Sequence, residues 1–175
     1  MTLSSSYLLV HNITKNSNFG FLIRTANAFA TELILIGKRK YHMRGAVAGT
    51  RRTPAHHFYT LREGVAFARD QGCRILGIEI APESQSIWDY PFEGPTVFIP
   101  GNEGEGLLEC HFEVCDDFVY IPQFGNAASL NVNVATAICL HHFVNWSGRA
   151  ESPRSDNQFA GPETMPSMHR RYQSS

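Results

Sequence analysis

The predicted fold is decided by the stretch Tyr120-Ile-Pro-Gln-Phe-Gly125-Asn-Ala-Ala-Ser129-Leu-Asn131-Val-Asn133-Val-Ala-Thr-Ala-Ile138. The apolar residues 118–121 are typical of a buried strand that stops at Pro122. After a loop of small residues, an apolar segment of helical length begins at Leu130, and Ser129 occupies the expected N-cap position. Backbone N–H groups at such a helix start suit a polar ligand. The alternative is that Ser129 only caps the helix and the loop is only a turn.

Length and composition predict one soluble globular domain. The chain has 175 residues, of which 43% are apolar and 18% charged, which suffices for a sizeable core. No apolar run approaches the length of a membrane span, and the start of the chain lacks the charged and apolar regions of a signal peptide. We therefore expect an intracellular, cytoplasmic protein without a membrane partner.

Apolar strands alternate with helices along the chain. Helical spacing of apolar residues predicts a helix over 18–30, and the capping-box pattern Thr60-x-x-Glu63 predicts another over 60–71. Strands are expected at 7–10, 33–36, 57–59, 74–80, 96–99 and 118–121, with a loop over 81–94. Such strands indicate an α/β fold with a parallel sheet and helices on both faces. Residues 1–146 would form this domain, and residues 147–175, rich in Ser, Pro, Arg and Gln, a disordered tail.

A strongly cationic segment lies within a chain whose net charge is -1. No acidic residue occurs between Glu32 and Glu63, where seven of the 15 basic residues lie. Tyr and His residues are interleaved with these charges, a mixture that suits phosphate contacts and base stacking. The alternative is a solvated loop; the absence of compensating acidic residues favours nucleic acid.

Arg24 projects from the first predicted helix. At about 100° per residue, the apolar residues Phe19, Leu22, Ile23 and Ala26 share one side of the helix, and Arg24 points away from it. The guanidinium is therefore free to meet a ligand. The alternative is an ordinary surface arginine.

The four cysteines, Cys73, Cys110, Cys115 and Cys139, form no CxxC pair and lie mostly in apolar runs. This pattern favours reduced thiols over a disulfide framework. Neighbouring histidines match no zinc spacing, so a metal site is disfavoured. A second loop, Pro100-Gly-Asn-Glu-Gly-Glu-Gly-Leu107, follows a predicted strand and allows close backbone approach to a ligand. It matches neither the dinucleotide fingerprint nor the P-loop.

Three segments taken together carry a family resemblance. The first motif is Asn18-x-Gly20-x-x-x-Arg24-Thr25, the second is Ile99-Pro-Gly101-Asn102-Glu103-x-x-Gly106-Leu107, and the third is Ile121-Pro122-x-x-Gly125-x-x-x-Ser129-Leu130-Asn131-Val132. In this order and spacing they resemble the SpoU (TrmH-like) family of RNA 2′-O-ribose methyltransferases, of the SPOUT superfamily. The resemblance spans residues 7–146.

The resemblance implies a homodimer and a parallel α/β sheet whose carboxyl-terminal part forms a trefoil knot. It implies S-adenosylmethionine as the cofactor, bound largely through backbone groups in the knot loops. The positions carried over are Ile99, Pro100, Gly101, Asn102, Glu103, Gly106, Ile121, Gln123, Ser129, Leu130 and Val132.

The implied reaction is methyl transfer to a ribose 2′-hydroxyl of tRNA or rRNA, with no metal. Arg24 is the family's catalytic position, and Asn18, Ser129 and Asn131 match polar positions that shape the same pocket. Because arginine stays protonated at neutral pH, orienting the hydroxyl and offsetting phosphate charge are easier roles for it than acting as a base. RNA capture would fall on the basic side chains Lys38, Arg39, Lys40, Arg44, Arg51 and Arg52.

Two positions depart from the family pattern. Many relatives have Pro and Met where this chain has Ser17 and Gln123, but neither change removes a reacting group. Two other functions remain open: a non-catalytic RNA-binding protein on the same scaffold, and methylation of a base rather than the ribose.

Overall fold

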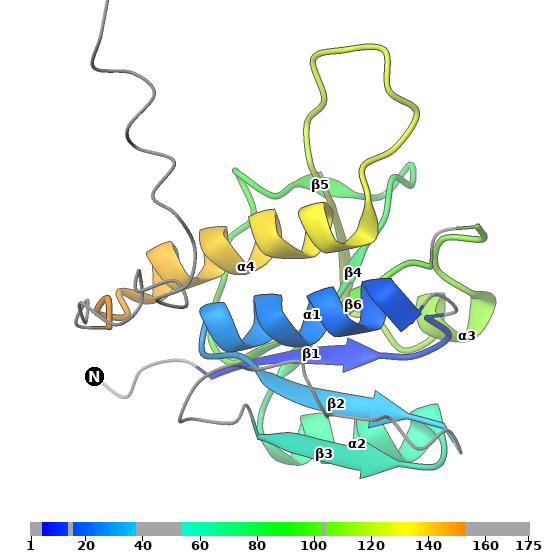
Figure 1. Ribbon diagram of the computed structural model, residues 1–175, viewed down its shortest axis with the longest axis vertical. Helices are drawn as coiled ribbons and strands as arrows, with labels where there is room; N and C mark the ends of the chain where they lie inside the picture. The colour runs from blue at the N-terminus through cyan, green and yellow to red at the C-terminus, as the bar shows by residue number, and fades with distance from the viewer. Residues whose placement is uncertain (1–4, 14–15, 38–53, 103, 153–175) are drawn as a thin grey trace, which may run out of the picture.

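The computed structural model describes residues 5–13, 16–37, 54–102 and 104–152. Strands and helices alternate along most of the chain (Figure 1). The elements in chain order are β1 (Ser6–Val10), α1 (Asn16–Ala28), β2 (Glu32–Ile36), β3 (Ala55–Phe58), α2 (Leu61–Asp70), β4 (Arg74–Ile78), β5 (Gln85–Ser86), β6 (Thr96–Pro100), α3 (Glu109–Phe112), β7 (Asp117–Tyr120) and α4 (Val132–Ser147).

The strands form one seven-stranded parallel sheet with the order β3-β2-β1-β6-β4-β7-β5. β6 lies between β1 and β4, pairing Leu8 with Phe98 and Leu76 with Phe98. The predicted α/β fold with a parallel sheet is therefore confirmed. Because all strands run in one direction, the loops after β4, β6 and β7 leave the same edge of the sheet.

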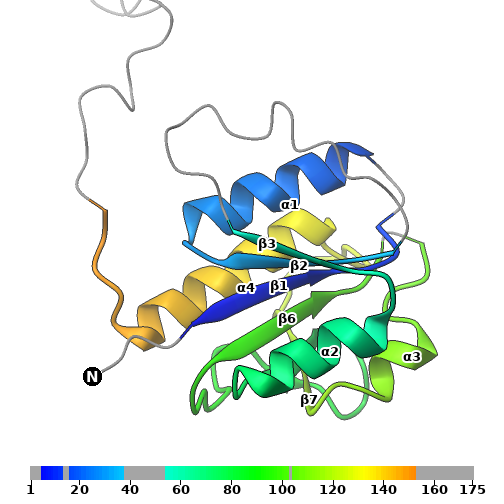
Figure 2. The same ribbon diagram turned by 90° about the horizontal axis from the view of Figure 1, so that it is seen from below.

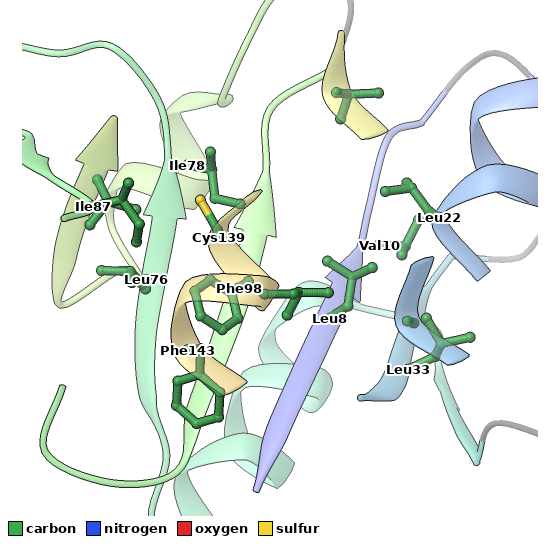
Figure 3. Close-up of a cluster of buried hydrophobic side chains, with 14 of the residues drawn as sticks. Leu8, Val10, Leu22, Leu33, Leu76, Ile78, Ile87, Phe98, Cys139 and Phe143 are labelled. Atoms are coloured by element: carbon green, nitrogen blue, oxygen red, sulfur yellow. The ribbon is translucent and has the colours of Figure 1, made fainter. Parts of the chain in front are cut away.

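Helices cover both faces of the sheet, as predicted (Figure 2). Leu8 and Val10 point to the face covered by α1 and α4, while Tyr7 and Leu9 point to the face covered by α2, the alternation expected of a strand. Figure 3 shows the first of these clusters, in which Phe143 from α4 meets strand residues. Aromatic side chains buried this fully contribute on the order of 3–5 kcal/mol relative to alanine.

The start of α2 is the predicted capping box. The Thr60 Oγ1 accepts the backbone N–H of Glu63, at 3.3 Å. The Glu63 carboxylate accepts the backbone N–H of Thr60, at 2.9 Å. These hydrogen bonds satisfy N–H groups that the first helical turn leaves without partners, and they lower the pKa of Glu63.

The start of α4 differs from the prediction. The helix begins at Val132 rather than Leu130, and its N-cap is Asn131 rather than Ser129. The Asn131 Oδ1 accepts the backbone N–H of Asn133, at 2.9 Å. Asn and Ser are similarly good caps, so the local sequence does not distinguish Ser129 from Asn131 as the N-cap. Ser129 remains in the loop, where its side chain is exposed.

The segment 81–94 was predicted to be a loop, but it contains the short strand β5, which pairs with β7. It also buries Ile87, Tyr90 and Phe92. Helix α3 was not predicted either. Both elements are too short to produce a periodic pattern in the sequence. They form through pairing and packing with distant parts of the chain.

The carboxyl-terminal end of the described chain returns to its beginning. After α4, Arg149 donates hydrogen bonds to the carbonyls of Phe29 and Ala30, at 3.0 and 3.1 Å, and to the Ser6 hydroxyl, at 3.0 Å. Its guanidinium also lies 5.5 Å from the ring centre of Phe143. The tail was predicted over residues 147–175; α4 extends to Ser147, and residues 153–175 lie outside the described residues.

The four cysteines are free thiols, as expected. No helix in the described part of the chain is long and apolar enough to cross a membrane.

Candidate functional site

A pocket of about 600 Å³ opens at the edge of the sheet where β4, β6 and β7 end. Ligands of parallel α/β sheets bind at this edge, beyond the carboxyl ends of the strands. The walls come from the start of α1, the three strand ends and the start of α4. The lining residues are Ser17, Asn18, Ile78, Glu79, Ile80, Pro100, Gly101, Asn102, Gly104, Gly106, Tyr120, Ile121, Gln123, Ser129, Leu130, Asn131, Val132 and Ala135.

The loop after β6, residues 101–107, is closed by its own hydrogen bonds. The backbones of Asn102 and Gly106 exchange two N–H···O bonds, at 2.9 and 3.2 Å. The Asn102 Oδ1 accepts the backbone N–H groups of Gly104 and Glu105, at 2.8 and 2.7 Å. The loop therefore has a defined shape without a ligand.

Two glycines are required for that shape. A Cβ on Gly101 would lie 2.8 Å from the Gly106 carbonyl carbon and 2.9 Å from its Cα, which are backbone atoms that cannot rotate away. Gly106 has a φ of +67°, in the left-handed region that favours glycine. The Gly-rich sequence thus allows two stretches of backbone to touch beside the pocket.

The start of α4 is joined to the start of α1 at the pocket. The Asn133 amide donates a hydrogen bond to the Asn18 Oδ1, at 3.0 Å. Asn18 is only 7% exposed. This bond links Asn18 of the first motif to the residue that directly follows the third motif.

Two buried oxygen atoms in this region find no hydrogen-bond partner among the described residues, Gln123 Oε1 and Asn133 Oδ1. A buried acceptor without a donor costs about 1–3 kcal/mol, so a ligand with N–H or O–H donors would be stabilised at Gln123, which lines the pocket. Leu130, Val132 and Ala135 supply an apolar wall. The pocket suits a ligand that combines an apolar part with hydrogen-bond donors.

Comparison with known proteins agrees with this architecture. Residues 5–141 match the SpoU rRNA Methylase family. The chain belongs to this family.

Among its relatives is the 23S rRNA (guanosine-2′-O-)-methyltransferase RlmB of Photobacterium profundum, 32% identical over 143 residues, which cover 78% of this chain and 58% of that protein. A similar solved structure is the SpoU methyltransferase AviRb from Streptomyces viridochromogenes, with 26% identity and a TM-score of 0.70, covering 83% of this chain and 61% of that one. AviRb in complex with the cofactor AdoMet has 24% identity and a TM-score of 0.69, covering 85% of this chain and 60% of that one, which shows the shared fold. The chain thus spans about three fifths of each relative's length.

Most positions carried over from the SpoU motifs lie together around the pocket. These are Asn18, Pro100, Gly101, Asn102, Gly106, Ile121, Gln123, Ser129, Leu130, Asn131 and Val132. Ile99 does not line it: its side chain is fully buried in the core between the sheet and α2. Glu103 and the basic residues Lys38, Arg39, Lys40, Arg44, Arg51 and Arg52 lie outside the described residues.

Arg24 is exposed on α1, while Leu22, Ile23 and Ala26 are buried. Its predicted projection away from the apolar side of the helix is confirmed. Arg24 does not line the described pocket. It lies six residues after Asn18, about 9 Å further along the helix.

Several lining residues were not identified from the sequence. Glu79 and Ile80 directly follow β4, and Tyr120 ends β7. The rule that ligands bind beyond the carboxyl ends of parallel strands would have pointed to these positions. Asn133, which does not line the pocket but donates to Asn18, was missed because Asn18 is 115 residues away in the sequence.

A cluster of His11, Cys110 and His111 has ligand atoms within 4.8 Å of one another. Leu108 donates its backbone N–H to His111 Nδ1, at 3.1 Å, and His111 Nε2 lies 2.8 Å from His11 Nδ1. With Nδ1 as an acceptor, the proton of neutral His111 sits on Nε2. Nε2 then donates a hydrogen bond to His11 Nδ1. Burial and the nearby His11 lower the pKa of His111 to about 4.

Proposed function

We propose that this protein is an RNA methyltransferase that uses S-adenosylmethionine to methylate a ribose 2′-hydroxyl of rRNA or tRNA. The observation that carries the proposal is the pocket itself. Residues of all three SpoU motifs, separated widely in sequence, line one cavity at the carboxyl edge of a parallel sheet. The RlmB relative is named for 2′-O-methylation of a guanosine in 23S rRNA.

The lining residues fit S-adenosylmethionine. Its adenine and ribose carry N–H and O–H donors, which suit the unpaired Gln123 Oε1. Its adenine ring suits the apolar surface of Ile121, Leu130 and Val132. The glycines of the 101–107 loop let the backbone approach closely. When bound, this cofactor supplies a methyl group made electrophilic by its sulfonium.

Arg24 is proposed to act on the RNA. A guanidinium stays protonated at neutral pH and donates hydrogen bonds in a fixed fork, so it can hold a phosphate and orient the attacking ribose hydroxyl. Holding the two reacting atoms in line removes much of the entropic barrier. Arg24 is therefore a positioning and charge-offsetting group, consistent with its exposed place outside the pocket.

RNA capture is assigned to the basic residues between 38 and 52, on the strength of their charge.

We further propose a homodimer formed through α1 and α4, which lie side by side (Figure 1). Phe21 on α1 and Val134 on α4 are 54% and 47% exposed, and the proposed interface would cover both side chains. Sedimentation at micromolar concentration should give twice the mass of the chain.

The proposed path of the chain from β6 to α4 is the trefoil knot of the SPOUT superfamily. Its support is family membership and the insertion of β6 between β1 and β4. A crystal structure with a continuous backbone trace would test the threading. The proposed substrate places the protein in the cytoplasm or another compartment that contains RNA.

The decisive experiment measures methyl transfer and cofactor binding in Arg24→Ala. Single-turnover transfer to RNA should fall by about 100-fold or more, whereas the affinity for S-adenosylmethionine and the stability should change little. Arg62→Ala is the matched control, since Arg62 is an exposed arginine on α2, on the opposite face of the sheet. Full turnover in Arg24→Ala would contradict the role of Arg24.

The same assay separates the two other functions left open. A chain that binds RNA, does not bind S-adenosylmethionine and does not transfer methyl groups would be a binding protein on the SpoU scaffold. Nucleoside analysis of the product RNA would distinguish a methylated ribose from a methylated base. We expect the label on the ribose.

A further inference from the structure

The pocket carries one charge that the proposed function has not used. Glu79 is the only charged residue among the described residues that line the cavity. It directly follows Ile78, the last residue of β4. A partly buried carboxylate among described lining residues that are otherwise uncharged is a specificity signal, because it favours a ligand of positive charge.

The Glu79 carboxylate is fixed in the wall by two backbone groups. Its Oε2 accepts the N–H of Leu107, at 2.9 Å, and its Oε1 accepts the N–H of Ile80, also at 2.9 Å. A Cβ on Gly106 would lie 2.3 Å from Oε2. The loop after β6 thus closes against the carboxylate, and the absence of a side chain at Gly106 makes room for it.

The charge of Glu79 is not neutralised by any described cation. The ion pairs found in the described parts of the chain use other acids: Glu32, Glu93, Asp116 and Asp117. The hydrogen bonds from Leu107 and Ile80 stabilise the carboxylate but carry no net charge. Its field therefore acts on whatever occupies the cavity.

We propose that Glu79 makes this pocket prefer the cationic methyl donor to the neutral product of the reaction. The inference rests on S-adenosylmethionine being the ligand. That molecule has a net charge of about +1 near neutral pH, from a sulfonium, an ammonium and a carboxylate, and S-adenosylhomocysteine, which lacks the sulfonium, has none. In the transfer, a C–O bond forms to the ribose, the electron pair of the C–S bond stays on sulfur, and the hydroxyl proton passes to solvent. The attraction to Glu79 is lost at that step, which favours release of the product.

The expected size of the preference is modest. Two unit charges about 7 Å apart in a solvent-accessible site attract enough to change an affinity about three- to tenfold. Glu79 is partly exposed, so solvent screening keeps the effect in this range.

The test is isothermal titration calorimetry of the full chain with S-adenosylmethionine and, separately, with S-adenosylhomocysteine. Glu79→Gln keeps the shape of the side chain and removes the charge, but it replaces one of the two acceptor oxygens with an NH₂ group, so one of the two backbone hydrogen bonds is lost for either ligand. The readout is therefore the ratio of the two affinities: the preference for S-adenosylmethionine over S-adenosylhomocysteine should fall about three- to tenfold. A purely structural role in holding the loop would weaken both ligands equally, which would overturn the proposal.

Glu105→Gln is the matched control. Glu105 is an exposed carboxylate on the same loop, and it accepts a hydrogen bond from the Asn102 amide, at 3.2 Å, but does not line the cavity. The ratio of the two affinities should stay unchanged in this variant.

A measurement on the unaltered chain makes the test independent of variant folding. Added salt should weaken S-adenosylmethionine binding and leave S-adenosylhomocysteine binding nearly constant. Equal salt dependence would overturn the charge preference while leaving the proposed function intact. Failure to bind either ligand would instead overturn the cofactor assignment itself, and the preference with it.

Discussion

The loop from Gly101 to Leu107 is held in shape by its own hydrogen bonds, whereas the loop from Pro122 to Leu130 is held at its two ends. In the first, four backbone N–H groups, those of residues 104–107, have partners within the loop or on Glu79. In the second, no backbone N–H of residues 122–130 donates to a described residue. Phe124 is 86% exposed and touches Trp88, with ring centres 5.9 Å apart.

The difference indicates that the two loops, which form two walls of the pocket, contribute differently to binding. The first loop presents a preformed surface, so its ordering cost is met during folding rather than on binding. The second loop can adjust to the ligand, and its ordering on binding reduces the affinity gained there. The comparison predicts that substitutions affect the two walls unequally.

The largest effect is expected from Gly101→Ala. The new Cβ would overlap the backbone of Gly106, so the first loop must open and its backbone groups move away from the ligand. Losing one or two hydrogen bonds of this kind should lower S-adenosylmethionine affinity about 10- to 100-fold in calorimetry. Gly125→Ala is the control in the second loop, where a Cβ meets nothing within 4 Å. Equal losses of affinity in both variants would contradict this difference between the two loops.

The next effect concerns pH, because a buried histidine holds the residue directly after the first loop, whereas the second loop has no titratable residue. His111, which is 1% exposed, accepts the N–H of Leu108. Its pKa of about 4 lies below the ordinary value of about 6.5. The neutral form is thus favoured by folding, and this contribution is complete above about pH 6.5 and is lost as the pH falls toward 4. Between pH 7 and pH 5 the free energy of unfolding should drop by about 2 kcal/mol from this group.

Denaturant unfolding at the two pH values checks this prediction. His111→Asn offers a hydrogen-bond acceptor that does not titrate in this range, so its stability should depend less on pH. An identical pH dependence in the variant and the unaltered protein would show that other groups, such as His11, carry the effect.

A smaller effect is expected in amide hydrogen exchange. Binding of S-adenosylmethionine should slow exchange about tenfold for residues 124–129, whose amides lack described partners, and change it less for residues 104–107. If residues 104–107 gained the greater protection, the first loop would be the one that the ligand orders.

The smallest effect distinguishes the two candidate N-cap residues of α4, Asn131 and Ser129. Asn131→Ala removes the oxygen that accepts the N–H of Asn133 and should cost about 1 kcal/mol of stability. Ser129→Ala removes an exposed side chain and should change stability by less than about 0.5 kcal/mol. Thermal unfolding of the two variants side by side would show whether the cap is correctly assigned.

The sequence predicted those parts of the molecule that depend on local patterns. Apolar runs located the longer strands, the Thr60 capping box located α2, and helical spacing predicted that Arg24 is exposed. The choice between Ser129 and Asn131 as the cap failed, because both have suitable side chains and the helix start depends on packing against α1. Glu79 was missed because its role depends on its contact with Leu107, 28 residues further along.

Ile99 shows a different limit. Its motif position suggested a pocket contact, but alternation along β6 turns its side chain to the other face of the sheet, where it is fully buried. A motif aligns the backbone of a loop with that of its relatives. It does not state which of two consecutive residues in the preceding strand faces the ligand.

The hydrogen bond between Asn133 and Asn18 has a consequence for the order of folding. It joins residues 115 positions apart, so forming it closes a very long loop of chain. Contacts of such long range form slowly, because the loop-closure entropy is lost before the contact stabilises anything. The pocket should therefore be completed late in folding, and recovery of S-adenosylmethionine binding after dilution from denaturant should lag behind recovery of helical circular dichroism.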